Sequence, residues 1–71
     1  MRIWLQEIRN KKNISQRDIA NKVGISRVTY TSYELGSRNP SVDVAKRIAD
    51  ELGFNWTLFF DNECNEKKQV T

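Results

Sequence analysis

Hydrophobic residues recur along residues 1–60 at the three- and four-residue spacing of amphipathic α-helices. Each run is short and is bounded by serine, asparagine, glycine or proline, which are typical of helix ends. The pattern predicts five helices, over about residues 2–12, 15–23, 26–35, 41–52 and 55–60. The three glycines all fall at predicted helix ends. This agreement between spacing and end signals favours an all-α fold.

The most distinctive segment has two short helical patterns that flank a tight turn at residues 24–26. The small Ala20 would let the second helix pass close to the first, and Gly24 can adopt the left-handed conformation that ends a helix. Such spacing is typical of two helices that cross steeply through a turn of about three or four residues. The segment therefore predicts a helix-turn-helix. Its first helix, the second of the chain, would cover about residues 15–23, and its recognition helix would cover about residues 26–35. The recognition helix would lie in the DNA major groove.

The charge of the chain is unevenly distributed. The 71 residues carry 12 Lys and Arg against 9 Asp and Glu, a formal net charge of +3. Residues 1–40 hold 8 Lys and Arg against 3 Asp and Glu, whereas residues 41–71 hold 4 against 6. The basic half contains the helix-turn-helix pattern, which favours a polyanionic partner such as double-stranded DNA.

The composition excludes several classes of site. The chain has no histidine and one cysteine, Cys64, which excludes an internal disulfide, a zinc site and a Ser-His-Asp arrangement. We therefore expect no enzyme activity, no metal and no cofactor. The longest apolar runs are 3 residues, too short for a signal-peptide core or a membrane span. We expect a cytoplasmic protein with no membrane partner.

A chain of this length forms one domain at most. We expect residues 1–60 to form the helix-turn-helix domain and residues 61–71 to form a polar, disordered tail. Only Cys64 and Val70 are apolar in that tail, and neither can anchor it, so Cys64 is expected to be a bystander. A domain this small buries only about 60% of its unfolded surface, so a dimer would supplement its stability.

Five short stretches carry a resemblance to a known family: Ser15-Gln16, Ile19-Ala20, residues 23–26, residues 33–41 and Leu52-Gly53. Their motifs, above all YELGSRNPS directly after a helix-turn-helix, are similar to those of the Cro and phage-repressor type of helix-turn-helix domain, the XRE family. The resemblance covers about residues 4–60 and implies a compact five-helix bundle like the DNA-binding domain of lambda repressor. It also implies operator binding, usually by a dimer, and a bacterial or bacteriophage source.

The resemblance assigns DNA contacts to three places. Gln16, at the start of the second helix, would bond a phosphate, and Arg17 joins it in a diffuse positive field. The third helix would line the major groove, and the loop after it would approach the backbone; the residues are Ser26, Arg27, Val28, Thr29 and Ser32, then Ser37, Arg38 and Asn39. Tyr30 departs from the family pattern, which has an aliphatic β-branched residue there. It could lie in the core or lean outward to DNA.

The roles of the individual groove residues stay open at this point. The planar guanidinium of Arg27 matches guanine O6 and N7, with a phosphate contact or plain solvation as alternatives. Val28 could pack on a thymine methyl or be a scattered surface residue. Thr29 and Ser32 could bond a base or a phosphate, or merely cap turns. Arg38 could bind phosphate, which sets affinity without reading sequence, or could be solvated.

Two further pairs of residues have expected structural or assembly roles. The family pattern pairs Arg9 with Glu34 in a largely buried ion pair that joins the first and third helices. Leu58 and Val44 are expected to point outward and to belong to the dimer contact. In the family, the surface around Leu58 serves the dimer contact, and an exposed leucine flanked by aromatic residues fits such an interface. Partial burial of Leu58 under the tail is the alternative.

These observations predict a sequence-specific DNA-binding transcriptional regulator of the Cro-like repressor type. It would bind a pseudo-palindromic operator as a weak homodimer and would repress by occupying that site. The alternative is a protein-contact module of the same fold, such as an antitoxin or a polymerase adaptor. We expect no small-molecule ligand, because too few residues follow the helices to form an effector domain.

Overall fold

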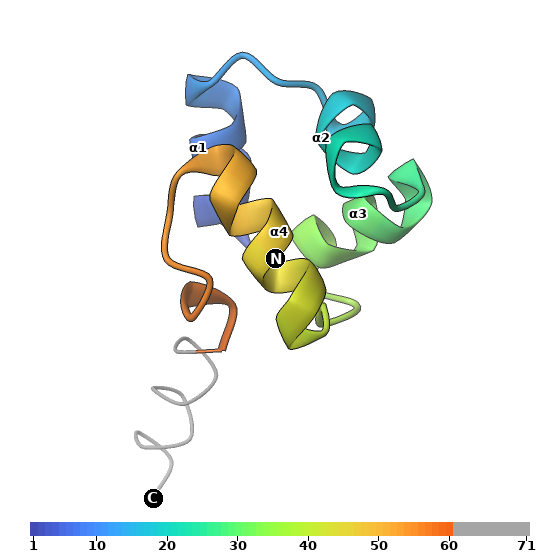
Figure 1. Ribbon diagram of the computed structural model, residues 1–71, viewed down its shortest axis with the longest axis vertical. Helices are drawn as coiled ribbons and strands as arrows, with labels where there is room; N and C mark the ends of the chain where they lie inside the picture. Colours follow the sequence, from blue (N-terminus) through green and yellow to red (C-terminus); the bar gives the residue numbers. More distant parts are fainter. Residues whose placement is uncertain (61–71) are drawn as a thin grey trace, which may run out of the picture.

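The computed structural model describes residues 1–60, which fold into helices joined by short loops (Figure 1). The helices are α1 (Ile3–Lys11), α2 (Gln16–Val23), α3 (Arg27–Leu35) and α4 (Val42–Leu52). A fifth helical segment begins over residues 58–60, at the end of the described part. No strand occurs within residues 1–60, which confirms the predicted all-α, five-helix fold. The predictions for residues 61–71, including Cys64, lie outside the described residues.

Serine side chains fix the starts of three helices. Ser15, Ser26 and Ser41 have extended backbone conformations, and each side-chain oxygen accepts a hydrogen bond from the N–H three residues later. The three bonds measure 3.0, 3.1 and 3.3 Å. Each satisfies one of the N–H groups that have no partner within the first turn of a helix. The helices α2, α3 and α4 therefore begin within a residue of the predicted positions.

The turn between α2 and α3 has the predicted conformation. Gly24 has a φ of 80°, in the left-handed region, directly after the last residue of α2. The N–H groups of Gly24 and Ile25 both donate to the Ala20 carbonyl, at 2.9 and 3.0 Å. The Ile25 side chain is half-buried and packs against the core. The turn thus closes α2 and starts α3 across it, as Figure 1 shows.

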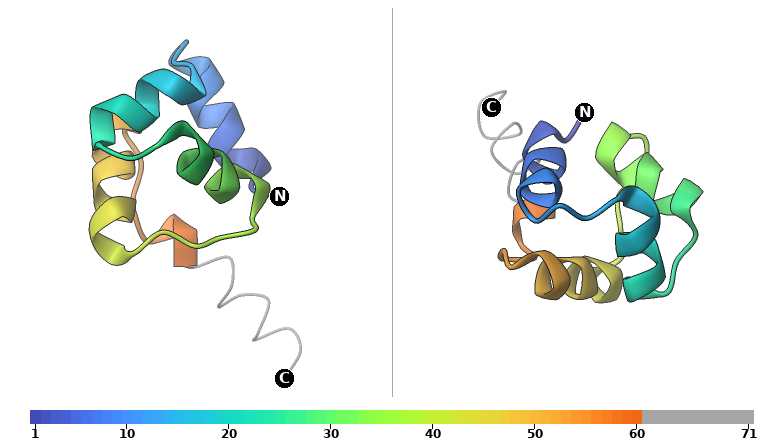
Figure 2. Two further views of the ribbon diagram at one scale, coloured as in Figure 1. Left: turned by 90° about the vertical axis from the view of Figure 1, so that its right-hand side faces the viewer. Right: turned by 90° about the horizontal axis from the view of Figure 1, so that it is seen from above.

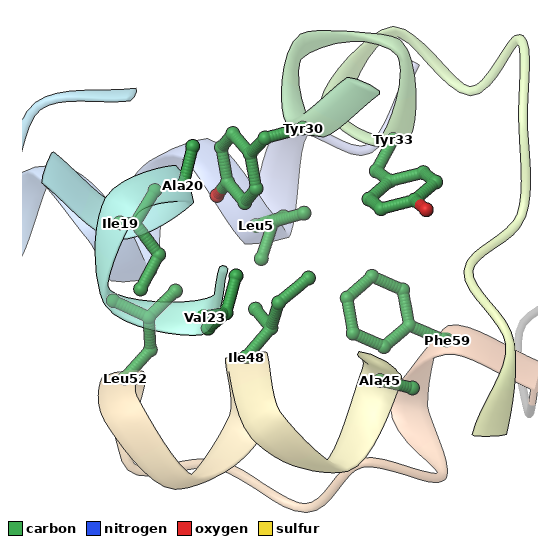
Figure 3. Close-up of a cluster of buried hydrophobic side chains, with 10 residues drawn as sticks. All are labelled: Leu5, Ile19, Ala20, Val23, Tyr30, Tyr33, Ala45, Ile48, Leu52 and Phe59. Carbon is green, nitrogen blue, oxygen red and sulfur yellow. The ribbon is translucent and has the colours of Figure 1, made fainter. Parts of the chain in front are cut away.

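Buried side chains from all parts of the bundle meet in one cluster (Figure 3). The helix α2 contacts both α3 and α4, and α1 packs on α3. Tyr30 of α3 is 0% exposed, and its ring lies beside Ala20 and Leu5 in the close-up. Tyr30 is therefore a core residue, which decides the question that its sequence position left open.

Aromatic contacts hold the segment after α4 against α1. The ring centroid of Trp4 lies 5.3 Å from that of Phe54 and 5.3 Å from that of Phe59, both in edge-on geometry. Such pairs contribute about 0.5–1.5 kcal/mol beyond their buried area. Asn55 starts the last turn, where its side-chain oxygen accepts bonds from the Thr57 N–H and hydroxyl. The end of the described chain therefore packs beside its beginning (Figure 2).

Two valines of α4 are placed differently from the prediction. Val44, expected to point outward, is half-buried and packs against the core. It precedes Ile48 by four residues, so both lie on the same buried face. The helical spacing of Val42, Ala45, Ile48 and Leu52 predicts one buried stripe, but Val42 is 49% exposed. As the first residue of α4, Val42 lies at the edge of that face.

Leu58, also expected to point outward, is half-buried, which agrees with neither a fully exposed nor a fully buried side chain. The expected orientation assumed α-helical spacing across residues 55–60. The observed turn is tighter, since the Leu58 N–H donates to Asn55 O at 3.0 Å and the Phe60 N–H donates to Thr57 O at 2.9 Å. Bonds over three residues rotate each side chain further than an α-helix does. Residues 55–58 thus depart from the α-helical spacing on which the expected direction of Leu58 rested.

We expect Gly24→Ala to lower the free energy of unfolding by about 1–2 kcal/mol, the penalty for a non-glycine residue in the left-handed region. A Cβ atom at this position would meet no atom within 4 Å, so the loss comes from the backbone alone. Urea denaturation measures the change. Gly24→Asn is the matched control and should lose less, because asparagine tolerates this conformation better. An alanine variant as stable as the unaltered chain would contradict this account of the turn.

Candidate nucleic-acid interface

The first turn of α3 projects two side chains away from the core. Arg27 is exposed, and Val28 beside it is 76% exposed. A guanidinium matches guanine O6 and N7, and an apolar side chain can contact a thymine methyl. The turn at residues 24–26 fixes where α3 begins. Arg27 and Val28 therefore project from the N-terminal end of α3, which is the end of a recognition helix that contacts base edges.

The hydroxyl groups of α3 are bonded within the helix and its cap. Thr31 Oγ1 donates to Arg27 O at 2.8 Å, and Ser32 Oγ donates to Thr29 O at 2.6 Å. Ser26 Oγ donates to Thr29 Oγ1 at 2.8 Å. The donating hydrogens of Thr31 and Ser32 are therefore engaged, and these two oxygens can offer lone pairs to a ligand. On this face of α3, the exposed Arg27 supplies charged donors.

An open pocket of about 480 Å³ lies beside the same face. It is formed at the starts of α2 and α3, and its lining residues are Arg9, Ser15, Gln16, Arg17 and Arg27. The guanidinium groups of Arg17 and Arg27 and the N-terminal end of α2 make this pocket attractive to anions. Arginine also bonds phosphate through two parallel N–H donors, so a phosphate is the ligand that this lining matches best.

A buried carboxylate connects this pocket to the rest of the fold. The Glu34 side chain is 1% exposed, and its Oε2 lies 2.6 Å from Arg9 Nε. Gln16 Nε2 donates to Glu34 Oε1 at 3.0 Å, and Thr31 Oγ1 lies 3.3 Å from Gln16 Oε1. Glu34 of α3 thus holds one side chain from α1 and one from α2. The Gln16 amide nitrogen keeps a second N–H for a ligand.

The loop after α3 carries a third group of exposed polar residues. Ser37, Arg38 and Asn39 are all exposed. The N–H groups of Ser37 and Arg38 donate to the Ser32 carbonyl at 3.1 and 3.3 Å, which ties the loop to the end of α3. The side-chain oxygen of Asn39 accepts a bond from Arg2, so that oxygen is used within the protein.

Comparison with known proteins agrees with this geometry. A family model described as helix-turn-helix matches residues 5–59. The chain belongs to the Cro and phage-repressor type of helix-turn-helix proteins. Members of this family are DNA-binding transcription regulators.

Three relatives illustrate the family. YqaF, an uncharacterized HTH-type transcriptional regulator of Bacillus subtilis strain 168, is 47% identical over 68 residues, which cover 96% of this chain and 90% of YqaF. AnsR, an HTH-type transcriptional regulator of the same organism, is 39% identical over 62 residues, or 87% of this chain and 47% of AnsR. The cryptic phage CTXphi transcriptional repressor RstR of Vibrio cholerae is 27% identical over 62 residues, or 86% and 56%. The chain therefore spans most of YqaF but about half of the other two.

No solved structure matches the chain. Within residues 1–60, no helix is long and apolar enough to cross a membrane. The same residues contain no group of three or more His, Cys, Asp or Glu side chains that could hold a metal ion.

The structure brings the family's expected contact residues into three neighbouring groups. Gln16, Arg17 and Arg27 line one pocket, and Arg27 leads from this pocket to the exposed face of α3. The sequence prediction had not placed Ser15 or Arg9 at the pocket, because a helix cap and an ion-pair partner gave no sign of a second role. It had also not singled out Thr31. Contact of Gln16, Arg17 or Arg27 with DNA stays a prediction.

The buried network fixes the charges of its members. Burial opposes ionisation of Glu34, but hydrogen bonds from Arg9 and Gln16 outweigh burial and hold the Glu34 pKa below its usual value. The bond to Glu34 likewise raises the pKa of Arg9. Burial, and then the nearby Glu34 carboxylate, raise the pKa of Tyr30 far above its usual value. At neutral pH the network therefore contains a carboxylate, a guanidinium and a neutral phenol.

We expect Glu34→Ala to lower the free energy of unfolding by about 3–5 kcal/mol, because it leaves the Arg9 guanidinium without its charged partner. Urea denaturation measures the loss. The exposed pair of Arg47 and Asp43, 3.2 Å apart, is the matched control, and Arg47→Ala should cost less than about 1 kcal/mol. Equal losses from the two variants would show that the Glu34 pair contributes no more than a surface pair.

We also expect the contribution of Glu34 to depend on pH in a definite direction. Its folded-state pKa lies below the unfolded value of about 4.3, so the contribution is present above that value and is lost as pH falls through the folded pKa. The difference in unfolding free energy between the unaltered chain and Glu34→Gln should therefore shrink as pH falls below about 4.3. Denaturation at a series of pH values measures this difference, and a constant difference would contradict the assignment.

Proposed function

We propose that this protein is a sequence-specific transcriptional repressor that binds a pseudo-palindromic operator as a dimer. It represses by occupying the operator and blocking access of polymerase or of a competing regulator. In this proposal α3 lies in the major groove, where Arg27 and Val28 contact base edges. A protein with this role works on double-stranded DNA in the cytoplasm.

The observation that carries the proposal is the pocket where α2 and α3 begin. Its lining combines Gln16 with the guanidinium groups of Arg17 and Arg27, directly beside the exposed face of α3. A phosphate held in this pocket would set the register of the protein on the duplex. The same register would place Arg27 and Val28 over the adjacent base edges. Affinity and base reading are thus supported by one contiguous surface.

The loop after α3 supports a second backbone contact. Arg38 is exposed there, and its N–H is bonded to the end of α3. In our proposal the Arg38 guanidinium binds a phosphate on the other side of the recognition helix from the pocket. Two phosphate contacts on either side of α3 would hold the helix in the groove.

The dimer contact is proposed at the last described turn. Trp56, Leu58 and Phe60 are all half-buried, so each keeps part of its apolar surface exposed. In our proposal, Leu58 and the exposed parts of the Trp56 and Phe60 rings, whose centroids lie 6.0 Å apart, form one small patch. A patch of this size would give a weak dimer that forms mainly on DNA, because stable interfaces usually bury about 1,200–2,000 Å². The recognition helices of the dimer would lie about 34–36 Å apart.

Selection of binding sites from random DNA tests the proposal as a whole. The purified chain should enrich a symmetric motif whose half-sites are about one helical turn apart. Enrichment of no motif, or of a motif without symmetry, would contradict sequence-specific binding by a dimer.

We expect Arg27→Ala to cost about 1–3 kcal/mol of binding free energy on the selected operator and to relax preference at one base pair per half-site. The matched comparison is Arg38→Ala, which should weaken binding to all sequences alike and reduce the salt-dependence slope by about 1 per site. Titrations at several salt concentrations, on operator and random DNA, separate the two effects. An equal loss on both DNAs for Arg27→Ala would make Arg27 a phosphate contact.

Leu58→Asp tests the dimer contact. The variant places a charge at the proposed two-fold contact, where it faces its own symmetry mate. We expect it to leave half-site binding intact and to abolish cooperativity on the full operator, where two monomers otherwise share a high effective concentration. Titration on half and full operators measures cooperativity, and circular dichroism checks the fold. Retained cooperativity would show that the dimer forms elsewhere.

A further inference from the structure

We propose that Arg2 is a positioning residue that holds the loop at residues 37–39 in the conformation that presents Arg38 to DNA. Arg2 stands just before α1, far in sequence from that loop. In space, the start of the chain lies beside the end of α3 and the loop that follows it (Figure 2). The inference rests on the proposed function, because it takes Arg38 as a phosphate contact.

Three hydrogen bonds of the Arg2 guanidinium reach the end of α3 and this loop. Its Nη1 donates to Tyr33 O at 2.6 Å and to Arg38 O at 3.1 Å, and its Nη2 donates to Asn39 Oδ1. Its backbone N–H donates to Glu34 O at 2.7 Å. One residue thus binds the last turn of α3 and two consecutive residues of the loop.

The guanidinium group is itself held in place. Its central carbon lies 5.5 Å from the centroid of the Phe59 ring. A planar guanidinium can lie against an aromatic ring while its edge donates several hydrogen bonds in fixed directions. An ammonium group cannot reproduce this arrangement, because it is a compact charge without a fixed fork. The contact therefore depends on the shape of arginine as well as on its charge.

The two ends of the loop are already fixed, and Arg2 fixes its middle. The N–H groups of Ser37 and Arg38 are bonded to the Ser32 carbonyl, and Pro40 is buried. Arg2 binds the Arg38 carbonyl and the Asn39 side chain between these ends. A loop ordered during folding loses less conformational freedom when it binds a ligand. Arg2 would thus raise DNA affinity without a contact of its own to the phosphate.

The first test is hydrogen exchange in the free protein, which needs no DNA. Arg2→Gln should speed exchange of the Ser37 and Arg38 amides by at least about tenfold, because their loop loses its central bonds. The Gly24 and Ile25 amides, in the turn after α2, should not change. Arg47→Gln is the control for loss of one arginine, since Arg47 is exposed and pairs with Asp43 on its own helix. Unchanged exchange at Ser37 and Arg38 would overturn the proposal.

The second test is a double-mutant cycle on the selected operator. Arg2→Gln and Arg2→Lys should each weaken binding about three- to tenfold, the coupling expected between contacting residues. In the Arg38→Ala background, either substitution should change affinity by less than about twofold. Full affinity in Arg2→Lys, or an equal loss in the Arg38→Ala background, would overturn the proposal. Failure of the unaltered chain to bind any selected DNA would instead overturn the proposed function. The hydrogen-exchange result would still decide whether Arg2 holds the loop, because that measurement uses no DNA.

Discussion

Glu34 places a negative charge inside a bundle that has few other buried polar side chains within residues 1–60. A buried carboxylate is costly unless opposite charge and hydrogen bonds surround it. Here Arg9 from α1 and Gln16 from α2 supply both, at 2.6 and 3.0 Å. Because each partner comes from a different helix, the requirement to satisfy one carboxylate fixes the relative positions of α1, α2 and α3.

The candidate DNA surface follows from that constraint. The side chains that satisfy Glu34, Arg9 and Gln16, are also members of the pocket lining, so the network that holds the helices together also shapes the pocket. The serine cap and the left-handed glycine then set where α3 begins, and with it the direction of Arg27 and Val28. Stability and ligand binding therefore use the same residues, and a change in the network should alter both.

The sequence predicted the parts of this arrangement that depend on local chemistry. Serine caps, glycines at helix ends and the stripe of Ala45, Ile48 and Leu52 mark elements that form from neighbouring residues. It did not predict the contacts of Arg2, because its partners lie 31 to 37 residues away and carry no common motif. Leu58 is half-buried where an outward side chain was expected, and the Leu58 N–H bonds over three residues to Asn55 O, which the assumed α-helical spacing did not include. The position of Tyr30 depends on the side chains of other helices that surround it in the buried cluster, and the sequence does not give those contacts.

The central claim is that one surface, from the start of α2 across α3 to the loop at residues 37–39, binds DNA. Titration of the isotopically labelled chain with a selected operator half-site, followed by amide chemical shifts, tests this claim most directly. We expect the largest amide shifts at residues 16–17, 26–32 and 37–39, with little change at the exposed Asp50 and Glu51 of α4. Shifts concentrated on α4 or on residues 54–58, with α3 unaffected, would contradict it.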